Sequence, residues 1–412
     1  MERVVLHCDA NSFYASVECV FHPEWRGKPM AVCGNAEIRH GIVLASTREA
    51  KQYGVKTGMV TWQAKQLCPL LIVSPPHSSL YTQFSNRMRA IFFDYTDRVE
   101  PFGLDECWLD VSDPKFTMED GAQLADRLRE RIKKELEITI SAGVSFNKPF
   151  AKLASDMKKP DATTVITKDN YKEIVWRLPI SDLLFVGPKT TRKLMDLRIY
   201  TIGDLARADA DLMQRLLGKN GLYLIAYANG YDLSPVKRLE DVPPVKSIGN
   251  SVTTPRDMTG AEDVKCVLYL LAESVAMRMR EQKFRSRRIS INVRDTKLNW
   301  ASCQRTLGHG TNLEDEIAET AMALFTERYL TLLPLRSIGI SCGQLESDTA
   351  PVQLDMFGDA LKRDARLALS TTIDDLRKQY GQLIVQRGVI MTDTMFSKLN
   401  PKEDHMNPVH GG

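Results

Sequence analysis

The stretch FGLDECWLDV, residues 102 to 111, decides the fold, because two adjacent acids, Asp105 and Glu106, stand among apolar, aromatic and β-branched residues. Side chains of a strand alternate between its two faces, so neighbouring carboxylates cannot both leave a flat strand on its polar side. The chain is therefore expected to turn there, and Gly103 and Asp105 are common turn residues. The residues alone leave two interpretations open: a solvated hairpin tip, since charged side chains are usually exposed, or a tip whose carboxylates bind a ligand.

A third acid, Asp9, stands at the end of the first predicted strand. The run from Val4 to Cys8 is almost continuously apolar, as in strands that are covered on both faces. Residues 11–21 then begin with cap-type residues and continue with apolar residues at helical spacing. The order strand, acid, helix places a carboxylate at the end of a buried strand.

Outward from these acids, the apolar pattern predicts an α+β fold. An amphipathic helix over 118–136 has apolar residues four apart, and 138–145 alternates like a strand. The full predicted order is β-α-β-β, helix, β-hairpin, helix, β, which indicates helices packed on a mostly antiparallel sheet. The other predicted elements are strands at 29–34 and 41–46 and helices over 48–59 and about 81–95.

The second half of the chain has the features of a nucleic-acid-binding protein. Residues 179–208 show a helix-hairpin-helix pattern, whose glycine turn lets backbone N–H groups approach a DNA phosphate. A proline-containing linker over 232–246 leads to a second α+β unit. Between residues 278 and 305 this unit carries nine Lys or Arg against two acids. A solvated helix face would normally mix signs, so this excess favours phosphate contact.

Composition sets wider limits. A chain of 412 residues with 43% hydrophobic and 26% charged residues is expected to form two to four globular domains. The net charge of +3 is too small to indicate a partner, and the eight cysteines show no zinc-site spacing. No apolar run has the length of a membrane span, and no signal peptide is recognisable, so a cytoplasmic protein is expected.

The acids and the basic module together fit two-metal phosphoryl transfer, in which carboxylates bridge paired Mg²⁺ ions.

Five motifs resemble those of the Y-family DNA polymerases, in particular the bacterial DNA polymerase IV group. The first also resembles the catalytic subunit of DNA polymerase V. Together they cover about residues 1–345 in the order of the family. They are HCDANSFYASVE (7–18), GVKTGM (54–59), FGLDECWLDV, AGVSFNKPFAKLASDMKKP (142–160) and KSIGNSVTTPRDM (246–258).

The resemblance implies a metal site and a nucleotide site. Asp9, Asp105 and Glu106 would be the catalytic residues and would hold two Mg²⁺ ions together with the carbonyl of Ala10. The ions would lower the pKa of the attacking hydroxyl. The nucleotide-binding residues that it implies are Asn11, Ser12 and Phe13 through backbone N–H groups, Tyr14 as a gate against the 2′-hydroxyl, and Arg48, Lys51 and Lys159.

The chain departs from the family at three places, one of which is the bulkier wording around Trp108. Arg48 and Lys51 stand where relatives carry a Tyr and an Arg, and Lys lacks the bidentate phosphate grip of Arg. Phe185 stands where the hairpin usually has a glycine, which leaves only Gly187 for close approach to DNA. The predicted DNA-binding residues are Gly187, Lys189, Arg285, Arg287, Arg288 and Arg294.

The implied architecture is a right hand. The expected divisions are palm 1–19 and 78–167, fingers 20–77, thumb 168–234, linker 235–245, little finger 246–345 and tail 346–412. Small fingers make an open site, so the implied task is low-fidelity translesion synthesis on primer-template DNA with dNTPs by a monomer. The tail contains Gln353, Leu354, Asp355, Met356 and Phe357, which resemble peptides that bind the bacterial sliding clamp, the β subunit.

Two other functions share part of this pattern. A two-metal nuclease would use the same carboxylates but needs neither an aromatic sugar gate nor a triphosphate-facing helix. A non-enzymatic scaffold bound to the clamp would not need Asp9, Asp105 and Glu106, all of which are present.

Overall fold

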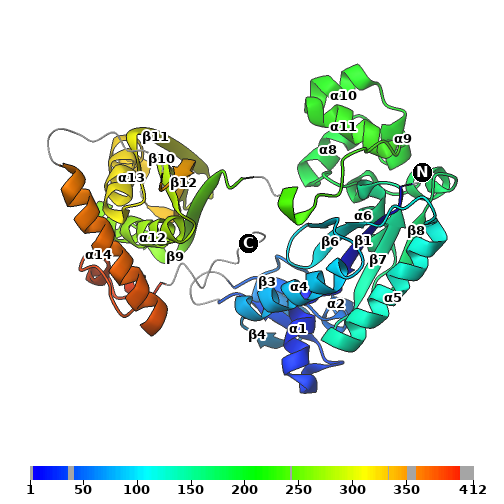
Figure 1. Ribbon diagram of the computed structural model, residues 1–412, viewed down its shortest axis with the longest axis horizontal. Coiled ribbons are helices and arrows are strands. Elements are labelled where there is room, and N and C mark those ends of the chain that lie inside the picture. The colour runs from blue at the N-terminus through cyan, green and yellow to red at the C-terminus, as the bar shows by residue number, and fades with distance from the viewer. Residues whose placement is uncertain (1–2, 36–40, 242–243, 333, 350–358, 400–412) are drawn as a thin grey trace. The chain divides into compact units, whose positions relative to one another are not determined.

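The structure, a computed structural model, describes residues 3–35, 41–241, 244–332, 334–349 and 359–399. The chain divides into two compact units, and the division at residues 242 and 243 falls inside the predicted linker. Each unit has its own sheet and helices (Figure 1). Among the described helices, none is both long and apolar enough to cross a membrane.

The first unit is built on a five-stranded sheet in the order β5-β6-β1-β7-β8. All neighbours are antiparallel except β7 and β8, so the predicted α+β class and the mostly antiparallel sheet are confirmed. The strands are β1 (Val5–Ala10), β5 (Val99–Pro101), β6 (Glu106–Asp110), β7 (Ile140–Ser145) and β8 (Thr163–Ile166).

Helices cover both faces of this sheet. The predicted amphipathic helix is α5 (Met118–Leu136), which begins with a capping box between Thr117 and Asp120. Its apolar stripe, including Leu124 and Leu128, is buried. The opposite face is covered by α6 (Lys148–Met157), and α1 (Phe13–Phe21) follows β1 and packs beside α4 (Ser78–Phe93).

Gly143 allows α6 to pack directly on β7. A Cβ atom at this position would overlap the carbonyl oxygen of Ala151 and the backbone nitrogen of Ser155, both on α6. The helix and the strand are therefore in backbone contact, which only glycine permits. This contact fixes the position of α6 over the sheet.

A smaller sheet in the order β3-β2-β4 lies within residues 20–77. The predicted helix over 48–59 is too long: α2 (Arg48–Gln52) ends where Gly54 and Gly58 adopt φ values of +88° and +83°. These left-handed glycines turn the chain instead of continuing the helix. The remaining elements are β2 (Met30–Cys33), β3 (Val43–Ser46), β4 (Ile72–Ser74) and α3 (Thr61–Leu67).

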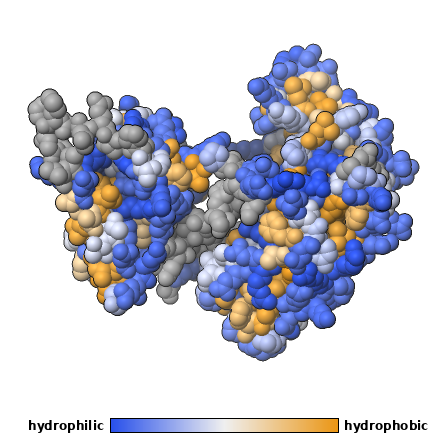
Figure 2. All heavy atoms as spheres, viewed as in Figure 1, coloured by the Kyte–Doolittle hydropathy of each residue, from blue (hydrophilic) through white to orange (hydrophobic). Residues whose placement is uncertain are grey.

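Short helices complete the first unit, as the sequence predicts. Phe185 adopts a φ of +69°, a left-handed conformation that favours glycine, the residue expected there from the helix-hairpin-helix pattern. Its ring, together with Tyr223 and Tyr227, lines a hollow of about 330 Å³, and apolar side chains gather on the surface of these helices (Figure 2). The helices are α7 (Tyr171–Val175), α8 (Pro188–Asp196), α9 (Ile202–Ala206), α10 (Ala210–Leu217) and α11 (Lys219–Ala228).

The second unit is a four-stranded antiparallel sheet in the order β11-β10-β12-β9, with α12 and α13 packed on one face. Alternate residues of β10 (Phe284–Asp295), such as Ile289 and Ile291, are buried against these helices. The other elements are β9 (Ser247–Met258), α12 (Ala261–Glu281), β11 (Trp300–Thr311), α13 (Glu314–Arg328) and β12 (Leu335–Ser347).

Part of the predicted tail belongs to this second unit. The helix α14 (Asp359–Tyr380) contacts α12, and the chain after it places Ile390, Phe396 and Leu399 in the core of the unit. Residues that the sequence assigns to a tail thus contribute to the core of this unit.

We expect Gly143→Ala to destabilise the first unit by about 3 kcal/mol, because the new methyl group forces α6 away from β7. Thermal unfolding of the full chain measures the loss. Gly187→Ala is the matched control, because nothing lies within 4 Å of a Cβ atom there and φ is −82°. Equal melting temperatures for the two variants would contradict the backbone contact.

Candidate active site

The two adjacent acids lie at the end of a hairpin loop between β5 and β6. The loop closes through the N–H of Phe102, which donates to the carbonyl of Glu106 at 2.8 Å, and Gly103 has a φ of +102°. Glu106 is the first residue of β6, whereas Asp105 is the last of the loop. Asp105 lies close enough to Asp9 and Glu106 to be affected by their charges, but it is not one of the three described residues whose ligand atoms lie within 4.8 Å of one another.

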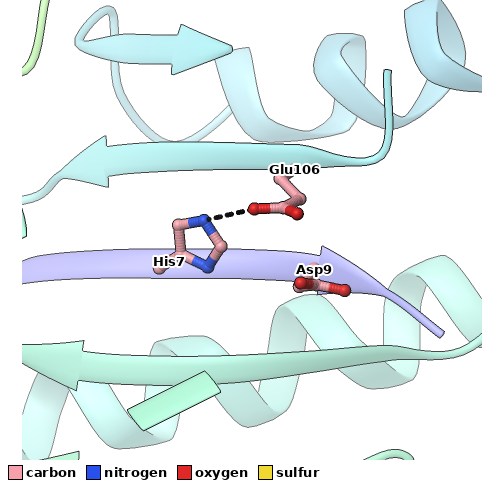
Figure 3. A group of neighbouring side chains, drawn as sticks. All are labelled: His7, Asp9 and Glu106. Atoms are coloured by element: carbon pink, nitrogen blue, oxygen red, sulfur yellow. Dashed lines mark ion pairs between the residues drawn. The ribbon is translucent and has the colours of Figure 1, made fainter. Parts of the chain in front are cut away.

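Strand pairing brings Asp9 to this hairpin. Asp9 lies opposite Glu106 in the antiparallel pair of β1 and β6, and the N–H of Ala10 donates to the carbonyl of Asp105 at 2.9 Å. Figure 3 shows His7, Asp9 and Glu106 together, with His7 and Asp9 on one strand and Glu106 on its neighbour. One ligand atom from each of these three lies within 4.8 Å of the others.

Two lysines, one on α6 and one just after it, lie close to these carboxylates. The Nζ atom of Lys152, on α6, lies 3.0 Å from Oδ2 of Asp9 and 2.7 Å from Oε2 of Glu106. The Nζ atom of Lys159 lies 2.9 Å from the same Asp9 oxygen. The cluster is therefore partly neutralised by cations that the protein itself supplies.

The pKa values of Asp105 and Glu106 are shifted in opposite directions. Burial alone would raise the pKa of Glu106, but His7 and Lys152 lower it to about 2. Burial, and then the charges of Asp9 and Glu106, raise the pKa of Asp105 to about 6. Asp105 is the acid whose charge the protein compensates least, which is expected of a group that a cation stabilises.

The donor atoms suit a hard divalent cation. Asp9, Asp105 and Glu106 supply carboxylate oxygens, the ligand type that Mg²⁺ prefers. His7 is completely buried, its Nδ1 lies 2.8 Å from the hydroxyl oxygen of Ser155, and its Nε2 lies 3.2 Å from Glu106. The imidazole thus contacts the Glu106 carboxylate with one nitrogen and Ser155 of α6 with the other. It therefore holds Glu106 in position from the buried interior.

The start of α1 lies beside the carboxylates. Ser12 adopts the left-handed conformation with a φ of +49° and does not cap the helix; its hydroxyl accepts a hydrogen bond from Lys51 at 2.8 Å. Burial, and then the nearby charge of Lys159, lower the pKa of Lys51. Burial, and then the charge of Asp105, raise the pKa of Tyr14. A helix start, two lysines and the Tyr14 ring therefore share one environment with the acids.

The surroundings of two more predicted nucleotide-binding residues, Asn11 and Arg48, are also defined. The backbone N–H of Asn11 already donates to the carbonyl of Thr139 at 2.9 Å, and its side chain is hydrogen-bonded to Ser141, so its backbone N–H is already used in this conformation. Arg48 is exposed on the first turn of α2, and no hydrogen bond joins it to the cluster in the described part of the chain.

The predicted DNA-binding residues lie elsewhere in the fold. Gly187 precedes α8 and Lys189 is exposed on its first turn. Arg288 and Arg294 alternate with the buried residues of β10 and so lie on the sheet face opposite α12 and α13. Arg287 forms an ion pair with Glu346 at 2.7 Å, and Arg285 lies opposite Glu346 in the sheet.

Sequence reasoning missed His7, Lys152 and Asp156, which pairs with both lysines. His7 stands two residues before Asp9 and therefore on the same face of its strand, which is a signal that the sequence does contain. Lys152 lies inside one of the quoted motifs, but only the packing of α6 reveals its role. The predicted clamp motif, residues 353–357, lies outside the described residues.

Comparison with known proteins gives a consistent result. The impB/mucB/samB family model matches residues 8–156, and the model of that family's C-terminal domain matches residues 245–356. The chain is 48% identical to DNA polymerase IV of Acetivibrio thermocellus over 97% of this chain and 100% of that protein. It is 39% identical to DNA polymerase IV of Moorella thermoacetica, over 94% and 96% of the two chains.

A solved structure agrees with these relatives. A Y-family DNA polymerase chimera superposes with a TM-score of 0.74 at 26% identity, covering 83% of this chain and 99% of the chimera. The family models together match more than half of the chain, and the closely similar relatives are matched over nearly their whole length. The chain belongs to the impB/mucB/samB family and is a Y-family DNA polymerase.

Proposed function

We propose that this polymerase adds dNTPs to a primer 3′-hydroxyl by two-Mg²⁺ phosphoryl transfer at Asp9, Asp105 and Glu106, and that it accepts damaged templates. The observation that carries the proposal is the convergence of these carboxylates with the start of α1, Lys51 and Lys159. A site that joins hard-cation ligands to a cationic anion site suits a metal-bound triphosphate.

In this proposal the three carboxylates and the carbonyl of Ala10 hold the metal ions. When bound, the ions lower the pKa of the primer hydroxyl and neutralise charge on the phosphates. Lys152 pairs with both Asp9 and Glu106 and holds them close together, and the buried His7 contacts Glu106 through its Nε2 atom. Lys159 and Lys51 bind the triphosphate together with the N–H groups of Ser12 and Phe13 at the helix start.

Tyr14 supports polymerisation over the nuclease alternative. Its hydroxyl is close enough to Asp105 to be affected by that charge, so the ring shares the environment of the acids and would be available to exclude a 2′-hydroxyl. A nuclease needs no such ring, and hydrolysis of DNA without added dNTPs is the result that would favour it. We assign residues 1–19 and 78–167 as palm, 20–77 as fingers, 168–234 as thumb, 235–245 as linker and 246–345 as little finger, to whose core the later residues Ile390, Phe396 and Leu399 contribute.

We expect Asp105→Asn to lower primer extension on undamaged and abasic templates by at least about a hundredfold, because it removes a carboxylate from the metal site. The same change removes repulsion from Asp9 and Glu106, so the metal-free variant should melt at a higher temperature than the wild type.

Thermal unfolding gives a readout that is independent of catalysis. Mg²⁺ should raise the melting temperature of the wild type but not that of Asp105→Asn, because a ligand stabilises only the state that binds it. Asp113→Asn, at an exposed acid just after β6, is the control and should leave both readouts unchanged. Full extension by Asp105→Asn would contradict the assignment.

The second unit supplies a surface for duplex DNA in this proposal. On β10 the face away from the helices carries Arg288, Ser290, Asn292 and Arg294. The register places small residues of β12 and β9 on the same face, including Gly339, Ser341, Gly343, Gly249 and Ser251. Small side chains let a phosphate backbone approach the sheet closely, and the two arginines add charge.

We expect the double variant Arg288→Ala, Arg294→Ala to weaken primer-template binding and to lower the slope of log K against log salt by about 1.8, or about 0.9 for each phosphate contact. Fluorescence anisotropy at several salt concentrations measures the slope. Arg305→Ala is the matched control, since Arg305 lies opposite the buried Ile289 in the sheet and is paired with Glu327. An equal slope change in the control would argue against a specific arginine face.

The sliding clamp is the proposed partner of residues 353–357. The motif stands between the end of β12 at Ser347 and the start of α14 at Asp359. Its Gln353 amide and the apolar residues Leu354, Met356 and Phe357 suit a shallow hydrophobic pocket.

We expect the double variant Gln353→Ala, Phe357→Ala to lose most of the stimulation of primer extension by the clamp, because it removes two anchors from the motif. Extension without the clamp should be unchanged and serves as the internal control. Undiminished stimulation would exclude this motif as the binding site.

A further inference from the structure

The ring of Tyr14 stacks on a second tyrosine that the sequence does not single out. Tyr81, on α4, lies with its ring centroid 4.4 Å from that of Tyr14 at an interplanar angle of 18°. Tyr81 is completely buried, and Phe13 lies within 6.4 Å of it. One face of the Tyr14 ring therefore packs against a buried aromatic ring instead of facing solvent.

Tyr81 is itself anchored to the helix that carries Tyr14. Its hydroxyl donates to Oε1 of Glu18 at 2.5 Å, and Nδ1 of His77 lies 2.8 Å from the same oxygen. Glu18 is one helical turn after Tyr14 on α1 and only 1% exposed. The contacts form a closed loop from Tyr14 to Tyr81, from Tyr81 to Glu18, and along α1 back to Tyr14.

A buried carboxylate is a costly way to hold two helices together. Apolar residues of similar volume usually pack at least as favourably, whereas a carboxylate that loses its partners is strongly unfavourable. The arrangement restricts Tyr81 to one position, because only there does its hydroxyl satisfy Glu18. Such an arrangement loses some packing energy, but it fixes the position of the Tyr81 ring.

We infer that Tyr81 and Glu18 are positioning residues that hold the Tyr14 ring in place and thereby set the discrimination between deoxyribonucleotides and ribonucleotides. The inference rests on the proposed function, in which Tyr14 lies beneath the sugar. If the ring can tilt or shift, the space that excludes a 2′-hydroxyl opens. Tyr81 and Glu18 act through Tyr14 and do not touch the nucleotide.

The test compares kcat/KM for a dNTP with that for the matching rNTP in single-nucleotide primer extension. We expect Tyr81→Leu, which removes the stacking surface, to lower the preference for dNTP about tenfold, and Tyr81→Phe, which removes only the bond to Glu18, about threefold. Tyr14→Ala should lower it more than either. Added to Tyr14→Ala, Tyr81→Leu should change the ratio no further, because a residue that acts through Tyr14 has no effect without it.

Phe92→Leu is the matched control, because Phe92 is a completely buried ring on the same helix that takes no part in the stack. It should lower the melting temperature and leave the sugar preference unchanged. If Tyr81→Leu does not fold, Tyr81→Phe carries the test with the smaller expected change.

The outcomes separate the inference from the function on which it rests. If Tyr14→Ala loses the preference but both Tyr81 variants keep it within twofold, the inference is overturned and the proposed polymerase site stands. If Tyr14→Ala also keeps the preference while DNA synthesis continues, the gate and the inference both fall. If the wild-type protein extends no primer, the proposed reaction fails as well.

Discussion

The antiparallel pairing of β1 with β6 is the constraint on which the rest of the site depends. It places Asp9 opposite Glu106 and ties the end of β1 to Asp105 through a backbone hydrogen bond. Gathering three carboxylates is unfavourable without compensating charge. Lys152 and Lys159 supply part of it, and Lys152 reaches the acids only because α6 packs against β7 at Gly143. A glycine in the sheet thus contributes to the charge balance of the active site.

The sequence predicted those parts of the fold whose local pattern and tertiary environment agree. The amphipathic α5, the buried β1 and the hairpin before β6 were found because their apolar periods match what they bury. The prediction of a helix over 48–59 was too long, because two left-handed glycines interrupt the helix-forming residues there. The short α3 and β4 escaped notice, since three to seven residues carry too little periodicity to be separated from a loop.

The residues of the candidate site likewise fall into those that the sequence could predict and those that it could not. Asp9, Asp105 and Glu106 were predictable because carboxylates among apolar strand residues demand an explanation. Lys152, Tyr81 and Glu18 were not, because an ordinary lysine, tyrosine or glutamate on a helix acquires its role only from the neighbour that packing provides. Asn11 shows the reverse case, in which the motif indicates a phosphate contact but the fold gives its N–H to Thr139. Register and packing, which the sequence does not state, decide these roles.

The helix α14 is held against the second unit mainly by charged and polar side chains. Its inward side is polar: Asp374 pairs with Arg280 at 2.6 Å, Arg377 pairs with Glu273 at 2.7 Å, and Ser370 donates to Glu314. Apolar residues of the same helix, including Leu369 and Tyr380, are 61% exposed. The apolar residues of this helix therefore do not mark the side that it buries. Buried ion pairs specify position more than they add stability, so α14 is aligned by charge, and the apolar residues that follow it complete the core.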